Sequence, residues 1–197
     1  RSSMRLRDAQ RRDYADNAYG TGLLQLAGLT VRTPAELAKP DSARLPAYQD
    51  SRKAGRERAL ASTTPIDTLQ ERMLLTQWFE AMQAALPATD PVLKAALKGR
   101  TPAEAAGAMV RGSKISTAAE REALIKGGAP AVAASQDPFI LLAATIDPLD
   151  RAVTKEWTAL ADREAEQDEV VARALLAVFG NSVAPDATFS LRISDGQ

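Results

Sequence analysis

Apolar residues recur every three or four positions along most of the chain, a spacing typical of amphipathic helices. The longest such pattern covers residues 148–179, and its middle, residues 162–169, is almost wholly polar and is expected to face water. The apolar positions of this pattern are Leu149, Val153, Trp157, Leu160, Val171, Leu175 and Phe179. The other helices are predicted at about 3–19, 23–31, just after Pro34, 49–61 and 67–86, with three or four short helices between 91 and 146.

Most predicted helix starts share one signal, a small polar residue followed by proline. Proline at the first helical position loses no needed N–H, and the preceding side chain can accept hydrogen bonds from the free amides. The signal occurs at Thr33-Pro34, Asp90-Pro91, Thr101-Pro102, Asp137-Pro138 and Asp147-Pro148. Capping boxes are predicted at Thr33 to Glu36, Thr101 to Glu104 and Thr117 to Glu120. Glycines predicted to end helices are Gly99, Gly112, Gly127, Gly128 and Gly180.

The period changes to two in residues 187–194, where Phe189, Leu191 and Ile193 alternate with polar side chains. Strict alternation predicts a half-buried β-strand. We predict no second strand in the chain, and an isolated strand would leave its main-chain groups unpaired. The strand is therefore expected to pair with a sheet outside the chain, and the rest is predicted to be all-α.

Composition supports the helical prediction and removes several kinds of chemistry. Alanine, the best helix former, accounts for 39 of the 197 residues. Lys and Arg number 25 and so do Asp and Glu, so no net charge favours nucleic acid. Without histidine or cysteine, this sequence alone provides no Ser-His-Asp triad, Cys-His pair or thiolate metal site. The apolar runs are too short for membrane insertion.

Several groups of polar residues suggest chemistry, but each is explained better by a structural role. Asp162, Glu166 and Glu169 share a helix face that could hold a cation, yet a solvated face with pairs to Arg163 and Arg173 is favoured. The glycines around Thr21 and at 127–128 are too short for a phosphate-binding loop and are interpreted as turns or caps. The arginines near the start are Arg1, Arg5, Arg7, Arg11 and Arg12. They could bind phosphate but are interrupted by acidic residues, so a solvated helix is favoured.

A Ser–Lys dyad at Ser113 and Lys114 is disfavoured, because adjacent residues point apart. Tyr48 is predicted to anchor a loop. Four apolar groups on the predicted helix 67–86 are interpreted as core rather than as a groove for a peptide or partner helix: Met73, Leu74, Trp78-Phe79 and Met82.

The segment 185–194, Pro-Asp-Ala-Thr-Phe-Ser-Leu-Arg-Ile-Ser, closely resembles a segment of the bacterial dipeptidyl-peptidases of serine peptidase family 46, of the dipeptidyl-peptidase 7 and dipeptidyl-peptidase 11 type. Further similar segments occur in the family's order at residues 44–51, 99–106, 110–115, 136–143, 146–148 and 177–180. The resemblance extends from about Leu23 to Ser194.

The resemblance implies a chymotrypsin-like double β-barrel with an inserted α-helical domain that caps the active site. Residues 1–184 would be the later part of that inserted domain, and 185–197 the first strand returning to the catalytic barrel. The family's catalytic His and Asp belong to an earlier segment, and its Ser stands in a later Gly-Asn-Ser-Gly context; neither motif is in this sequence. We therefore assign no catalytic, cofactor-binding or metal residue and expect no cofactor.

The resulting hypothesis is the helical lid of an enzyme that releases dipeptides from oligopeptide N-termini in the periplasm or at the outer bacterial surface. The lid would be inactive when isolated. Its expected partners are the rest of the parent peptidase and the oligopeptide substrate, with a homodimer of the intact enzyme compatible with this picture. The alternative is a free-standing helical interaction module whose C-terminal strand pairs with a partner sheet. A helical carboxylate metal protein is the third hypothesis.

Overall fold

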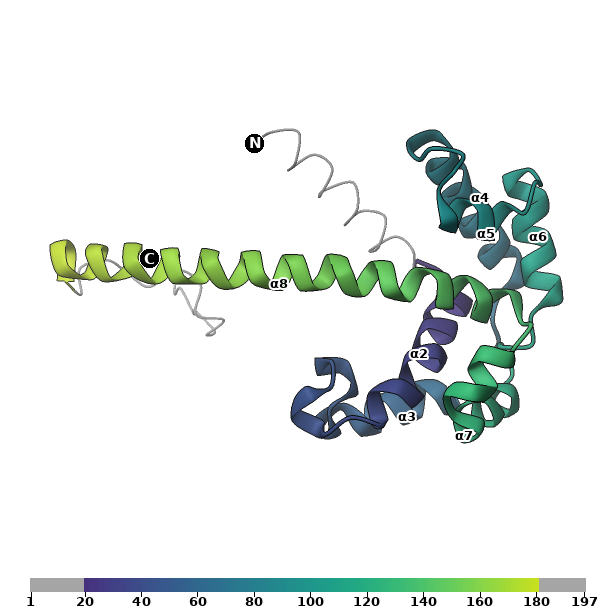
Figure 1. Cartoon of the computed structure of the whole chain (residues 1–197), viewed down its shortest axis with the longest axis horizontal. Coiled ribbons are helices and arrows are strands. Elements are labelled where there is room, and N and C mark those ends of the chain that lie inside the picture. Colours follow the sequence, from purple (N-terminus) through teal and green to yellow (C-terminus); the bar gives the residue numbers. More distant parts are fainter. Residues whose placement is uncertain (1–19, 181–197) are drawn as a thin grey trace, which may run out of the picture. The chain divides into compact units, whose positions relative to one another are not determined.

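The computed structural model describes residues 20–180, and these residues form α-helices, short 3-10 turns and loops, with no strand among them. The chain is therefore all-α over this range, as predicted (Figure 1). The predicted helix at 3–19 and the predicted strand at 187–194 lie outside the described residues.

The α-helices are α2 (Gly22–Leu37), α3 (Lys53–Ala61), α4 (Thr68–Ala85), α5 (Pro91–Leu97), α6 (Pro102–Gly112), α7 (Ala118–Ala134) and α8 (Pro138–Phe179). The 3-10 turns η1 (Asp41–Ala43), η2 (Pro46–Tyr48) and η3 (Asp50–Arg52) lie between α2 and α3. The chain divides into two compact units, Arg1–Val153 and Thr154–Gln197, and the division falls within α8. No single described helix is both long enough and apolar enough to cross a bilayer, although α7 and α8 taken together meet these two criteria.

The core of the first unit is built from one apolar face of each of several helices. Helix α4 packs against α5 and α6, and α2 packs against α3 and α7. Large apolar side chains such as Phe79 and Phe139 are fully buried, and the same cluster includes buried alanines such as Ala106. Alanine allows helices to approach closely, so a core with few large side chains is still continuous.

The local signals at several helix ends are confirmed. The Asp90 carboxylate accepts from the N–H groups of Val92 and Leu93 at 2.9 and 3.0 Å. Thr101 and Glu104 form the predicted capping box at the start of α6. Gly99, Gly128 and Gly180 all have positive φ, the conformation that favours glycine at a helix end. At Gly128 this conformation kinks α7.

Two predicted helix starts are wrong, because the helix continues through the proline. Pro34 lies inside α2 and Pro148 lies inside α8. The Thr33 hydroxyl donates to the Leu29 carbonyl at 2.6 Å instead of capping a new helix. The Asp147 carboxylate accepts from Arg32 of α2 and from Arg151 one turn further along α8, so both of its oxygens bond to side chains instead of to main-chain amides.

The third predicted capping box, at Thr117 to Glu120, is also absent. The Thr117 hydroxyl donates to the Lys114 carbonyl at 2.9 Å, so its side chain closes the preceding turn and makes no capping bond to α7.

The predicted core of α4 is only partly confirmed. Trp78, Phe79 and Met82 are buried, but Met73 is 55% exposed and Leu74 is 36% exposed, so the core prediction is wrong for these two. Residues 73 and 74 lie outside the buried face of α4 that includes Leu75 and Phe79. The prediction that Tyr48 anchors its loop is confirmed: the side chain is buried, and the Arg56 guanidinium lies 5.9 Å from its ring centre.

Buried charged side chains fix the positions of several helix ends. Arg121 donates to the carbonyls of Leu60, Ile115 and Ser116 at 2.8, 2.7 and 2.9 Å, and also to the Ser62 carbonyl. The Glu71 carboxylate on α4 accepts from the N–H groups of Gly22 and Leu23 at 2.7 and 3.1 Å. The bonds to residues 60, 62, 22 and 23 satisfy main-chain groups that the end of α3 and the start of α2 leave without partners.

Asp137 combines two such roles, because it caps α8 and also holds the connection between α6 and α7. Its carboxylate accepts from the Phe139 N–H at 2.9 Å and the Lys114 N–H at 2.7 Å. It also accepts from the Ile115 N–H at 3.2 Å and the Ser113 hydroxyl at 2.9 Å.

We expect Asp137→Ala to lower the free energy of unfolding by about 3 kcal/mol, because it removes a helix cap and leaves buried donors unpaired. The matched control is Asp90→Ala, which removes a cap from α5 alone and is expected to cost about 1 kcal/mol. Urea denaturation of both variants measures the two losses. Equal losses would show that Asp137 acts only as a cap.

Candidate functional site

The described residues do not form the Ser–Lys dyad considered from the sequence. The Ser113 hydroxyl donates to the Asp137 carboxylate, and the Lys114 main-chain N–H donates to the same group. Ser113 is thus bonded to an acidic residue in a helix cap. The chain has no histidine to act as a general base near neutral pH.

The acidic residues on the later part of α8 are solvent-exposed, as the favoured interpretation predicted. Asp162, Glu166 and Glu169 are all exposed, and Glu169 accepts a hydrogen bond from Arg173. Over residues 20–180, no group of three or more acidic side chains is arranged to hold a metal ion.

The first notable polar site joins α2 to the first part of α8. Glu36 is fully buried, and its carboxylate accepts from Lys39 Nζ at 2.7 Å, the Leu45 N–H at 2.9 Å and Arg151 at 2.6 Å. Burial alone would raise the pKa of Glu36, but these three hydrogen bonds and the Arg151 charge outweigh it and lower the pKa to about 2. Glu36 is therefore ionised at all ordinary pH values.

The ion pairs at this site lie on both sides of the internal prolines of α2 and α8. Arg32 and Glu36 flank Pro34 on α2, and Asp147 and Arg151 flank Pro148 on α8. Arg32 bonds to Asp147 and to Asp150, while Arg151 bonds to Glu36 and to Asp147. Every charge in this group has an opposite partner, so the site stabilises the fold and leaves little capacity for a ligand.

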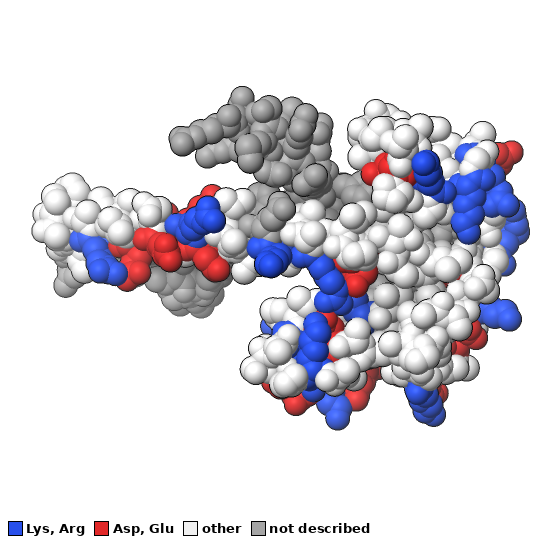
Figure 2. Space-filling model, viewed as in Figure 1, with Lys and Arg blue, Asp and Glu red and all other residues white. Residues whose placement is uncertain are grey.

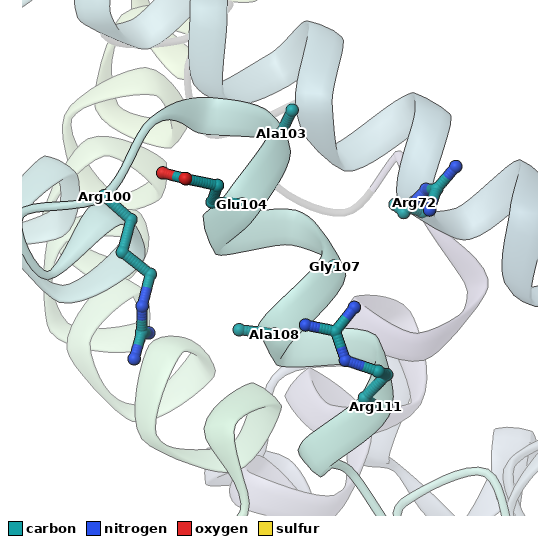
Figure 3. Close-up of a pocket in the computed structure, with 7 residues that line it drawn as sticks. All are labelled: Arg72, Arg100, Ala103, Glu104, Gly107, Ala108 and Arg111. Carbon is teal, nitrogen blue, oxygen red and sulfur yellow. The ribbon is translucent and has the colours of Figure 1, made fainter.

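The second polar site is an open cavity of about 480 Å³ between α4 and α6, lined by Arg72, Arg100, Ala103, Glu104, Gly107, Ala108 and Arg111 (Figure 3). Its charged residues are exposed, and three of the four are arginines. In Figure 2, Lys and Arg side chains gather over the region where Figure 1 places α6, with little acidic surface among them.

Glu104, the one acidic residue that lines this cavity, is part of the capping box of α6. The Thr101 hydroxyl donates to Glu104 at 2.8 Å and the Thr101 N–H at 3.1 Å. These two bonds, together with the nearby Arg100 charge, lower the pKa of Glu104. Arg72 and Arg111 form no ion pair with any residue in the described range. Unlike the first site, this cavity therefore has positive charge without matching negative charge.

Sequence analysis did not identify this cavity. Glu104, Ala108 and Arg111 are four and three positions apart, so the sequence alone indicates that they share one face of α6. Arg72 comes from a different helix, and only the packing of α4 on α6 brings it to the same place.

Comparison with known proteins agrees with the resemblance found in the sequence. The family model described as Peptidase S46 matches residues 3–197, which is nearly the whole chain. No curated protein matches the chain.

We expect Glu36→Gln to be less stable than the parent chain at pH 7, by at most about 3 kcal/mol. The pKa of Glu36 is lowered on folding from 4.5 to about 2, so its contribution is complete above pH 4.5 and is lost as the pH falls towards 2. The difference in unfolding free energy should therefore shrink over this interval, as measured by urea denaturation across pH.

The control for this prediction is Glu57→Gln on α3, where the carboxylate is exposed and lies 3.9 Å from Lys53. Its effect should be small at every pH. A Glu36→Gln deficit that stays constant between pH 5 and pH 2 would contradict the role given to the ionised carboxylate.

Proposed function

The chain belongs to the peptidase S46 family, and from this premise we propose that it is the helical lid of a serine dipeptidyl-peptidase. The lid closes over a catalytic barrel formed by other segments of the parent enzyme. It restricts the space available to the substrate beyond two residues from the N-terminus. The enzyme then releases dipeptides rather than internal fragments.

The observation that carries the proposal is the family match over a helical chain that has no histidine. A serine peptidase of the triad type needs a base that takes the proton of the nucleophile, and histidine has that role. The chain therefore contributes shape and positioning, and the acyl-transfer chemistry belongs to residues outside it. No metal or organic cofactor is part of the proposal.

The packing of the first unit supports a lid, because a lid has to keep its form when it closes. Arg121 ties the end of α3 to residues 115 and 116, Asp137 ties α8 to the same connection, and Glu71 ties α4 to the start of α2. The bonds of Arg121 to Leu60, of Asp137 to Lys114 and of Glu71 to Gly22 link segments 23 to 61 residues apart in the sequence. They give the unit rigidity despite its alanine-rich core.

The proposal includes a location and partners. The parent enzyme acts on oligopeptides in the periplasm or at the outer bacterial surface. The lid's partners are the catalytic barrel and the N-terminal part of the substrate. The strand predicted from the sequence at residues 185–197, outside the described residues, is proposed as the connection to the barrel.

We expect the purified 197-residue chain to release no dipeptide from fluorogenic dipeptidyl substrates, because it has no histidine. The parent enzyme is the positive control in the same assay. Peptidase activity that stays with the chain through a further purification step would contradict the proposal.

A second prediction concerns product length. Replacing residues 20–153 of the parent enzyme by a short Gly-Ser linker should allow products longer than dipeptides, as measured by mass spectrometry of a digested oligopeptide. Labelling of the catalytic serine by a fluorophosphonate checks that the barrel is intact. A labelled variant that still releases only dipeptides would show that this segment does not limit product length.

A further inference from the structure

We propose that the cavity between α4 and α6 binds an acidic segment of a peptide. The cavity has a volume of about 480 Å³, and three of its seven lining residues are arginines. Its single acidic residue, Glu104, is held by the α6 capping box. Positive charge that is not neutralised within the protein is the first requirement of a site for anions.

Two of the arginines place side-chain atoms close to Gly107, where α6 has no side chain. A Cβ atom placed on Gly107 would lie 3.1 Å from an Arg111 guanidinium nitrogen and 3.7 Å from Arg72 Cδ. The Arg111 guanidinium therefore lies across the face of α6 that has no side chain, with Arg72 of α4 beside it. Glycine at this buried position makes room for the Arg111 guanidinium.

The arginines favour carboxylates as the ligand. A guanidinium is planar, stays charged and can donate two parallel hydrogen bonds to one carboxylate. Arg72, Arg100 and Arg111 are exposed, so their hydrogen-bond donors are accessible. Because exposed charges are screened by salt, the affinity should fall as the ionic strength rises.

The floor of the cavity favours a peptide over a small inorganic anion. Ala103 and Ala108 present small apolar surface between the arginines, and Figure 3 shows the Ala108 side chain directed into the space between Arg100 and Arg111. A peptide can lay its main chain and methylene groups on this surface while its carboxylates meet the arginines. A phosphate ion would use the arginines but would leave the apolar floor uncovered.

The test is fluorescence anisotropy of the full chain with a labelled peptide in which Glu alternates with Ala, at low salt. The matched peptide with Gln in place of Glu should bind at least about tenfold more weakly, since charge-assisted hydrogen bonds are lost. Arg72→Gln, Arg100→Gln and Arg111→Gln should each weaken binding of the Glu peptide about tenfold.

Two further variants separate the cavity from general charge and from loss of fold. Arg58→Gln removes an equal charge from an exposed position on α3 and should change the affinity less than about twofold. Ala108→Leu keeps all three arginines and a helix-favouring residue but fills the floor, so it should weaken binding about fivefold while circular dichroism and the melting temperature show an intact fold.

Equal binding of the Glu and Gln peptides, or equal losses from Arg58→Gln and Arg111→Gln, would overturn the proposal. Retained affinity in a folded Ala108→Leu variant would also overturn it, since the apolar floor would then have no role. Complete displacement of the Glu peptide by an equal concentration of inorganic phosphate would assign the site to simple anions instead. No turnover is measured, so failure here would leave the lid proposal unaffected.

Discussion

The helical unit depends on buried charged side chains that bond to main-chain groups. The chain has 39 alanines, and the largest fully buried side chain among residues 20–180 is an arginine, Arg121. Its guanidinium meets four carbonyl groups, two of them at the end of α3, where the helix dipole favours a cation. Burial lowers the pKa of Arg121, but arginine stays protonated in proteins. Arg121 therefore keeps its hydrogen bonds to the neighbouring segments whatever the pH.

Small residues have two opposite effects in this structure. Inside the unit, buried alanines such as Ala105 and Ala106 let α6 approach its neighbours closely. On the cavity side of the same helix, Ala103, Gly107 and Ala108 leave space that longer side chains would fill. One helix therefore provides both a close packing surface and a floor bordered by arginines.

The sequence predicts a feature of this fold well where the feature is decided within a few residues. Asp90 and Thr101 cap helices because the amides they accept from follow directly in the chain. Asp147 carries the same Asp-Pro signal, but its carboxylate accepts from Arg32 of α2 and from Arg151 one turn further along α8, and the helix continues. Similarly, the apolar spacing predicts that α4 is amphipathic. It does not show how much of the surface of α4 the neighbouring helices cover, so Met73 was assigned to the core although it is exposed. The arginine cavity needs two helices and has no single-segment signal.

The internal prolines of α2 and α8, Pro34 and Pro148, have a shared mechanical consequence. Each removes one main-chain hydrogen bond, so each leaves a turn that bends more readily than its surroundings. In this protein the weakened turns of α2 and α8 are bridged by Arg32 and Arg151, whose partners stand on either side of the prolines. Flexing one helix at its proline would strain ion pairs anchored on the other. The stiffness of α2 and α8 at their prolines therefore depends on the ion pairs between the two helices.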